Sequence, residues 1–150
     1  MANTYTNLLY HIVFSTKHRE PLIHNSLKPE LHKYLGGLVR DKKGILLEVG
    51  GMADHVHLVV KLRPDTSVSD VVKYIKANSS GWVNDRPDQQ GSFYWQTGYA
   101  AFTVSESQLP TVGDYVLNQE SHHRGQTFKE ELLALLRKHN VESDERYLWD

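Results

Sequence analysis

The chain contains no cysteine among its 150 residues. This absence excludes a disulfide framework and every metal site built from thiolates, and it fits a reducing cytoplasm. No stretch approaches the ~20 consecutive apolar residues that span a bilayer, so we expect no transmembrane helix. The N-terminal segment MANTYTN has neither a basic region nor an apolar run, so we expect no signal peptide.

An excess of positive charge is also missing. The 17 Lys and Arg residues are balanced by 18 Asp and Glu residues, which gives a formal net charge of -1. This balance argues against a general basic surface for duplex DNA. It does not exclude a nucleic-acid site, because only the local field in a groove governs binding there. Histidine is abundant instead: the nine histidines are the leading candidates for metal ligands once cysteine is absent.

The hydrophobic pattern predicts one α+β domain over residues 1–150. Strands and helices alternate in the split β-α-β order of a ferredoxin-like fold, in which two helices cover one face of an antiparallel sheet. A further C-terminal helix should lie near the other, open face. The expected elements are strand 6–15, helix 27–40, strands 45–49 and 55–62, helix 67–82, a strand region 93–105 with a break at Gly98, and helices 109–122 and 127–139.

The stretch DHVHLVV places two histidines in a strand that is otherwise apolar. Side chains alternate along a strand, so Val56 and Leu58 should face the two covering helices, and His55 and His57 should share the opposite face. Their Cα atoms should lie about 7 Å apart, which lets both imidazoles reach one metal ion. Two interpretations stay open: a pair of metal ligands, which would need a third ligand from elsewhere, or a polar surface pattern.

The segment DYVLNQESHHRG forms part of a predicted helix. Tyr115 and Gln119 are four residues apart and therefore lie on one helical face. Taken alone, this spacing favours an ordinary amphipathic helix with a packed tyrosine and a solvated glutamine. His122, His123 and Arg124 follow, and their position is typical of cations near the C-terminus of a helix.

Taken together in their order, several stretches resemble the HUH endonucleases. The closer resemblance is to the single-tyrosine transposases of small bacterial insertion sequences (the insertion-sequence-two-hundred-like family) and the related REP-associated tyrosine transposases. It spans nearly the whole chain and is carried by YHIVFSTKHR, DHVHLVV, VSDVVKYIKANSS, WQTGYAAFTVS, YVLNQESHHR and ERYLWD.

The resemblance implies a DNA transposase: a metal-dependent single-stranded DNA endonuclease and strand transferase. His55 and His57 would be metal ligands, Gln119 the third ligand through its amide oxygen, and Tyr115 the nucleophile that forms a covalent 5′-phosphotyrosine. Such proteins use Mg²⁺ or Mn²⁺, recognise imperfect DNA hairpins and usually work as dimers, for which an exposed edge strand offers a route. The alternatives are a hairpin-binding module without turnover and a replication nickase of the same superfamily.

Several further residues are candidates for supporting roles. His11, by strand parity, could orient one of the metal-binding imidazoles. Basic side chains could contact the DNA backbone, and solvation is the alternative for each of them. These candidates are Lys61, Lys17, Arg19, Lys73, Lys76 and Arg124.

Overall fold

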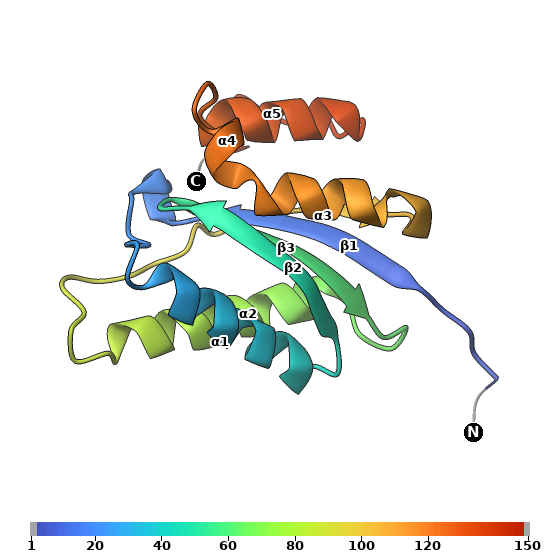
Figure 1. The fold of residues 1–150 in the computed structure, drawn as a ribbon, viewed down its shortest axis with the longest axis horizontal. Coiled ribbons are helices and arrows are strands. Elements are labelled where there is room, and N and C mark those ends of the chain that lie inside the picture. Colours follow the sequence, from blue (N-terminus) through green and yellow to red (C-terminus); the bar gives the residue numbers. More distant parts are fainter. Residues whose placement is uncertain (1–2, 149–150) are drawn as a thin grey trace.

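The protein is built around a four-stranded antiparallel sheet with the strand order β2-β3-β1-β4 (Figure 1). The computed structural model describes residues 3–148. The strands are β1 (Leu8–Ser15), β2 (Ile45–Met52), β3 (His55–Leu62) and β4 (Ala100–Val104). The prediction for β3 is confirmed at both ends. β1 begins two residues later than predicted, and β2 continues three residues further.

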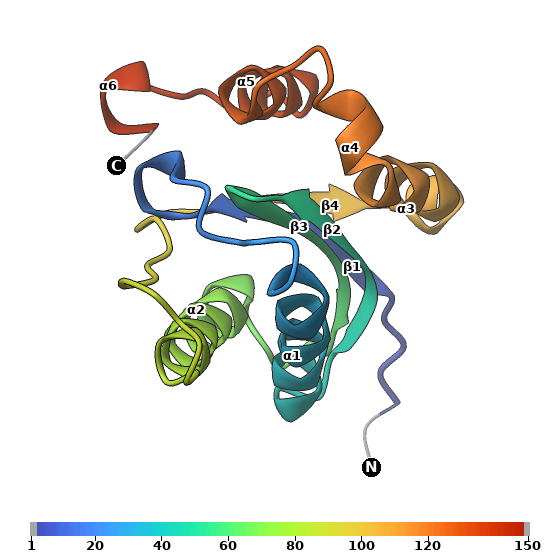
Figure 2. The same ribbon diagram turned by 60° about the vertical axis from the view of Figure 1, so that its left-hand side comes forward.

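Helices cover both faces of this sheet (Figure 2). On one face lie α1 (Lys28–Asp41) and α2 (Val68–Asn84), which confirms the predicted ferredoxin-like arrangement. The Ser67 side chain begins α2 by accepting a hydrogen bond from the Asp70 backbone amide at 3.1 Å. The other face carries α3 (Leu109–Leu117), α4 (Gln119–His122) and α5 (Phe128–Lys138), followed by α6 (Glu145–Leu148).

The alternation along β3 divides its side chains between two cores. Val56, Leu58 and Val60 are fully buried and belong to the apolar cluster under α1 and α2. A second, smaller cluster lies on the opposite face, between β1, β4 and α5. It consists of Val13, Phe102, Phe128, Leu132 and Leu136. Because the C-terminal helices pack there, the face that the sequence predicts to be open is in fact covered.

The predicted strand region 93–105 is wrong over its first half. Only residues 100–104 form β4, and Trp95 contributes one isolated bridge to Thr16. The side chain of Asn84 holds both the amide and the carbonyl of Phe93, at 2.8 Å and 3.0 Å. Those groups therefore need no neighbouring strand, and the buried rings of Phe93 and Trp95 fill the core from an irregular segment.

The predicted helix 109–122 is two helices, because the backbone departs from helical geometry at Asn118 (φ -98°, ψ 33°). The predicted helix 127–139 is confirmed as α5, within one residue at each end. Of the motif ERYLWD, Glu145–Leu148 form α6, whereas Trp149 and Asp150 lie outside the described residues. Among the described residues, no helix is both long and apolar enough to cross a membrane.

Candidate active site

The site begins with the two histidines of β3. His55 and His57 point away from α1 and α2, as their alternation with Val56 predicts, but both are fully buried rather than exposed. Helix α3 lies over the two histidines and over the adjacent strand β2. The β2 residue that pairs with His57 and contacts α3 is Gly50. A Cβ atom on Gly50 would lie 2.0 Å from the carbonyl oxygen of Val116, so only glycine permits this approach.

Tyr115 and Gln119 reach the histidines from above the sheet. The amide oxygen of Gln119 lies 3.0 Å from His55 Nε2, and its amide nitrogen donates to the Tyr115 carbonyl at 3.3 Å. This second bond ties the two residues together across the break at Asn118. The Tyr115 ring stands edge-on to His57, with 5.7 Å between the ring centroids. The structure therefore brings together all four residues that the resemblance singled out.

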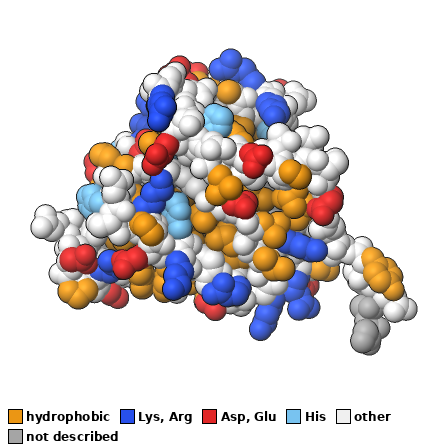
Figure 3. Space-filling model, viewed as in Figure 1, with side chains coloured by type: hydrophobic (Ala, Val, Ile, Leu, Met, Phe, Trp, Pro, Cys, Tyr) orange, Lys and Arg blue, Asp and Glu red, His pale blue; other side chains and the backbone are white. Residues whose placement is uncertain are grey.

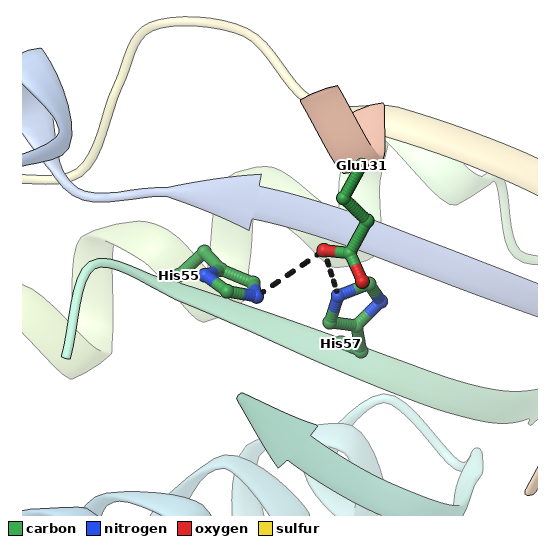
Figure 4. A group of neighbouring side chains, drawn as sticks. All are labelled: His55, His57 and Glu131. Carbon is green, nitrogen blue, oxygen red and sulfur yellow. Dashed lines mark hydrogen bonds and ion pairs between the residues drawn. The ribbon is translucent and has the colours of Figure 1, made fainter. Parts of the chain in front are cut away.

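Sequence reasoning missed the acidic residue at the centre of this group. Glu131 of α5 is 1% exposed, and its Oε1 atom lies 3.0 Å from His57 Nε2 and 3.4 Å from His55 Nε2 (Figure 4). Its Oε2 atom accepts a hydrogen bond from the Tyr115 hydroxyl. One carboxylate thus contacts both histidines and the tyrosine. The available signal was its helical spacing from Phe128, which places a charged residue on the buried face of α5.

The outer nitrogens of the two histidines also have fixed partners. His55 Nδ1 lies 2.7 Å from Asp54 Oδ1, and His57 Nδ1 lies 2.8 Å from His11 Nε2. The contact predicted for His11 is therefore confirmed. Partners on the Nδ1 side orient an imidazole ring, so the Nε2 atoms of both rings face the centre of the site.

The pKa values of Glu131, His55 and His57 are shifted by burial and by their mutual contacts. Burial alone would raise the pKa of Glu131, but its hydrogen bonds with His55 and His57 hold that pKa well below its ordinary value. Burial opposes the charging of His55 as well, yet its bonds to Asp54, Glu131 and Gln119 raise its pKa to about 9. The pKa of His57 is lowered, chiefly by burial. Without a metal ion, the group therefore contains an ionised carboxylate and one imidazolium.

The pKa of Tyr115 is raised above its ordinary value, first by burial and then by the hydrogen bond to Glu131. At neutral pH its hydroxyl therefore stays protonated and donates a hydrogen bond to that carboxylate. A nucleophilic phenolate would require a cation close by.

The donor atoms of the site suit a divalent metal ion. Ligand atoms of His55, His57 and Glu131 all lie within 4.8 Å of one another. Metal–nitrogen and metal–oxygen bonds of about 2.1 Å place ligands at right angles ~3.0 Å apart. Two observed distances match that value: His57 Nε2 lies 3.0 Å from Glu131 Oε1, and His55 Nε2 lies 3.0 Å from Gln119 Oε1. Imidazole, carboxylate and amide oxygen together suit ions such as Mn²⁺.

The six basic residues that the sequence offered for DNA contact do not form one group. Lys17 and Arg19 lie in a short 3-10 turn just after β1, and Lys61 lies at the other end of β3 from His55. Lys73 and Arg124 are exposed. Lys76 donates a hydrogen bond to the carbonyl of Gln96 at 2.9 Å and also contacts the carbonyls of Thr97 and Gly98, and burial lowers its pKa to about 8.

Comparisons with known proteins agree with this arrangement. The transposase for insertion sequence element IS200 of Salmonella typhimurium is 29% identical over 124 residues, which cover 79% of this chain and 81% of that protein. A crystal structure of a protein described as a transposase from Deinococcus radiodurans R1 superposes with a TM-score of 0.61 at 25% identity, and the match covers 79% and 95% of the two chains.

A third comparison shows the shared fold alone, because its sequence identity is only 13%. It is the structure of the REP-associated tyrosine transposase bound to a REP hairpin, with a TM-score of 0.58 over 77% of this chain and 68% of that one. Finally, the family described as "Transposase IS200 like" matches residues 4–119, a segment that holds His55, His57, Tyr115 and Gln119. The chain therefore belongs to the IS200-like transposase family.

Proposed function

We propose that this protein is a single-tyrosine transposase of the HUH type: a metal-dependent endonuclease and strand transferase acting on single-stranded DNA. The observation that carries the proposal is the shared contact of Glu131. Its carboxylate joins the hydroxyl of Tyr115, the proposed nucleophile, to the Nε2 atoms of the histidine pair. Residues 1–150 would act as one domain, since β3, α3, α4 and α5 all contribute to this one site.

Tyr115 would attack a phosphodiester in the DNA strand. Its oxygen forms a bond to phosphorus as the bond from phosphorus to the 3′ oxygen breaks, which leaves a 5′-phosphotyrosine and a free 3′ hydroxyl. The phenol proton already has an acceptor in the carboxylate of Glu131, and the leaving 3′ oxygen takes up a proton. Because one phosphoester replaces another, the reverse reaction can rejoin strands without ATP.

The proposed cofactor is a divalent ion, Mg²⁺ or Mn²⁺, bound by His55, His57 and Gln119, with Glu131 within reach. When bound, such an ion neutralises charge on the phosphate oxygens. The protein's own contribution is positional: Asp54 and His11 orient the two imidazoles, and the hydrogen bond from Gln119 to the Tyr115 carbonyl holds the nucleophile beside them.

The proposed partner is single-stranded DNA with imperfect hairpins, in keeping with the family and with the hairpin bound by the REP-associated neighbour. A cleft of about 260 Å³ lies beside Gln119 and is also lined by Lys28, His32 and Gly50. We place the strand to be cleaved there. Lys17, Arg19, Lys73 and Arg124 remain proposed backbone contacts, whereas Lys76 is held on the carbonyls of residues 96–98.

We also propose that the protein is a homodimer. β2 is an edge strand of the sheet, and apolar side chains of β2 and α3 gather on the face seen in Figure 3. Ile45 is 53% exposed and Leu117 is 58% exposed, and a second hollow of about 350 Å³ lies between Leu47 and Leu109. An unpaired edge beside exposed apolar side chains suits pairing with a second copy of the chain.

The nucleophile can be tested by trapping the covalent intermediate. Purified protein would be incubated with Mn²⁺ and with single-stranded oligonucleotides tiled across the DNA on both sides of its gene. We expect an SDS-resistant protein–DNA adduct that disappears in the Tyr115→Phe variant and in chelator. Tyr99→Phe, which removes the hydroxyl of a 42% exposed ring, is the matched control and should retain the adduct.

Two outcomes would overturn the proposal. An adduct that survives Tyr115→Phe would mean that another group attacks the DNA. Hairpin binding that chelator does not affect, with no adduct from the wild-type protein, would instead identify a binding module without turnover.

A further inference from the structure

His123 lies at the site, although the matched family segment ends four residues before it, at residue 119. Its side chain is 8% exposed in the turn between α4 and α5, and its ring centroid lies 4.7 Å from that of His55. Its Nε2 atom lies 3.1 Å from Gln119 Oε1 and 3.1 Å from Glu131 Oε1. It therefore faces the same two oxygens that face His55.

A hydrogen bond on the Nδ1 side fixes the orientation of the His123 ring. Its Nδ1 atom lies 2.8 Å from the backbone carbonyl oxygen of Gln126. A carbonyl oxygen can only accept, so Nδ1 carries the proton and, in the neutral ring, Nε2 presents a lone pair. That lone pair points at two acceptor oxygens. Such an arrangement is unfavourable by itself and becomes favourable when Nε2 is protonated or when a metal ion lies between the nitrogen and the oxygens.

The strand histidines face the same two oxygens. His55 is bound on its outer side by Asp54, and its Nε2 faces Gln119 and Glu131. His57 faces Glu131 in the same way. Three imidazole nitrogens thus face one amide oxygen and one carboxylate oxygen. Their five nitrogen–oxygen separations run from 3.0 to 3.4 Å. These values span the spacing of adjacent ligands around an ion with bonds of about 2.1 Å, ~3.0 Å in octahedral and ~3.4 Å in tetrahedral geometry.

We propose that His123 and Glu131 complete the metal centre, which then has five protein ligands and selects a transition-metal ion over Mg²⁺. The inference rests on the proposed function only in placing a metal at this site. Mg²⁺ binds oxygen ligands and keeps several waters, so a centre with three imidazoles suits it poorly. Imidazole suits transition-metal ions such as Zn²⁺ and Ni²⁺, and the affinity of a nitrogen and oxygen site rises from Mn²⁺ to Co²⁺. With five positions taken, an octahedral ion would keep one position for a phosphate oxygen.

The proposal is tested by metal binding rather than by cleavage. Metal-free protein would be titrated with Mn²⁺, with free ion measured by electron paramagnetic resonance, and with Co²⁺, whose visible absorption reports its ligands. We expect His123→Ala to weaken Mn²⁺ binding by at least ~10-fold and to change the Co²⁺ spectrum, since even the loss of an outer partner of a ligand costs ~10–100-fold. The control is His24→Ala, the same change at an exposed histidine before α1, which should bind as the wild type does.

Two further variants guard against a folding defect. His123→Phe keeps a ring of similar size without a lone pair, and Glu131→Gln keeps the shape without the charge. Both should weaken Mn²⁺ binding while circular dichroism shows a folded chain. The proposal is overturned if the folded His123 variants bind Mn²⁺ like the wild type, or if the wild type binds Mg²⁺ as tightly as Mn²⁺. An adduct formed normally by His123→Ala with Mg²⁺ would sink this inference and leave the tyrosine mechanism standing.

Discussion

Gly50→Ala should separate the nucleophile from the metal-binding histidines. Gly50 pairs with His57 across β2 and β3, and α3 lies directly over it. The added Cβ would lie 2.0 Å from the Val116 carbonyl oxygen and 2.9 Å from its carbonyl carbon. Both contacts are to backbone, so no side-chain rotation relieves them, and α3 must move by ~1 Å to restore van der Waals distances.

Two magnitudes follow from that displacement. Overpacking of this kind costs ~1–3 kcal/mol, and each kcal/mol lowers the melting temperature of a chain of this size by ~2–4 °C. We therefore expect a loss of about 2–12 °C. Tyr115 is the neighbour of Val116 and moves with it, and a misplacement of ~1 Å in a reacting group can lower the rate ~100-fold. Metal binding by the β3 histidines should suffer much less than adduct formation.

The assay pairs thermal melting with the rate of adduct formation. The matched control is Gly81→Ala in α2, where the added Cβ meets no atom within 4 Å. That change should be neutral or stabilising by up to ~1 kcal/mol, because alanine favours a helix more than glycine does. If Gly50→Ala melts within a degree of the wild type and forms adduct at the same rate, the close approach of α3 to β2 does not position Tyr115.

Two other variants test separate features. Ile45→Lys, on the exposed edge of β2, should convert a dimer to a monomer in light scattering, and a monomeric wild type would contradict the proposed assembly. His32 should make the protein acid-sensitive, since burial lowers its pKa to about 4. Below pH 6.5 this histidine binds a proton in the unfolded chain but not in the folded one. Its contribution to the free energy of unfolding is therefore present above that pH and falls by about 2 kcal/mol between pH 7 and pH 5. His32→Phe should remove most of that loss in urea denaturation at the two pH values, and an unchanged pH dependence would rule His32 out as its source.

The part of the site that lies on β3 follows from local sequence. Strict alternation from Val56 to Leu62 assigned each side chain to a face, and the same parity in β1 placed His11 beside His57. Period-two patterns survive folding because a slip of one residue would expose the whole apolar face. The strand predicted around Trp95 was wrong because a distant side chain determines the backbone there. Its aromatic residues favour a strand, but Asn84 binds the backbone of Phe93, which leaves the rings free to fill the core.

Glu131 and His123 depend on how distant elements pack, so no local pattern assigns them a role. Burying an unpaired carboxylate costs several kcal/mol of folding free energy. A glutamate on the apolar face of α5, such as Glu131, therefore implies cationic or hydrogen-bonding partners elsewhere in the chain. The nine histidines were the obvious source of such partners in a chain without cysteine. The same energetics explains why α5 docks where it does: its apolar residues bury against β1 and β4 only if Glu131 meets His55, His57 and Tyr115. The packing of α5 against the sheet and the assembly of the proposed active site therefore depend on each other.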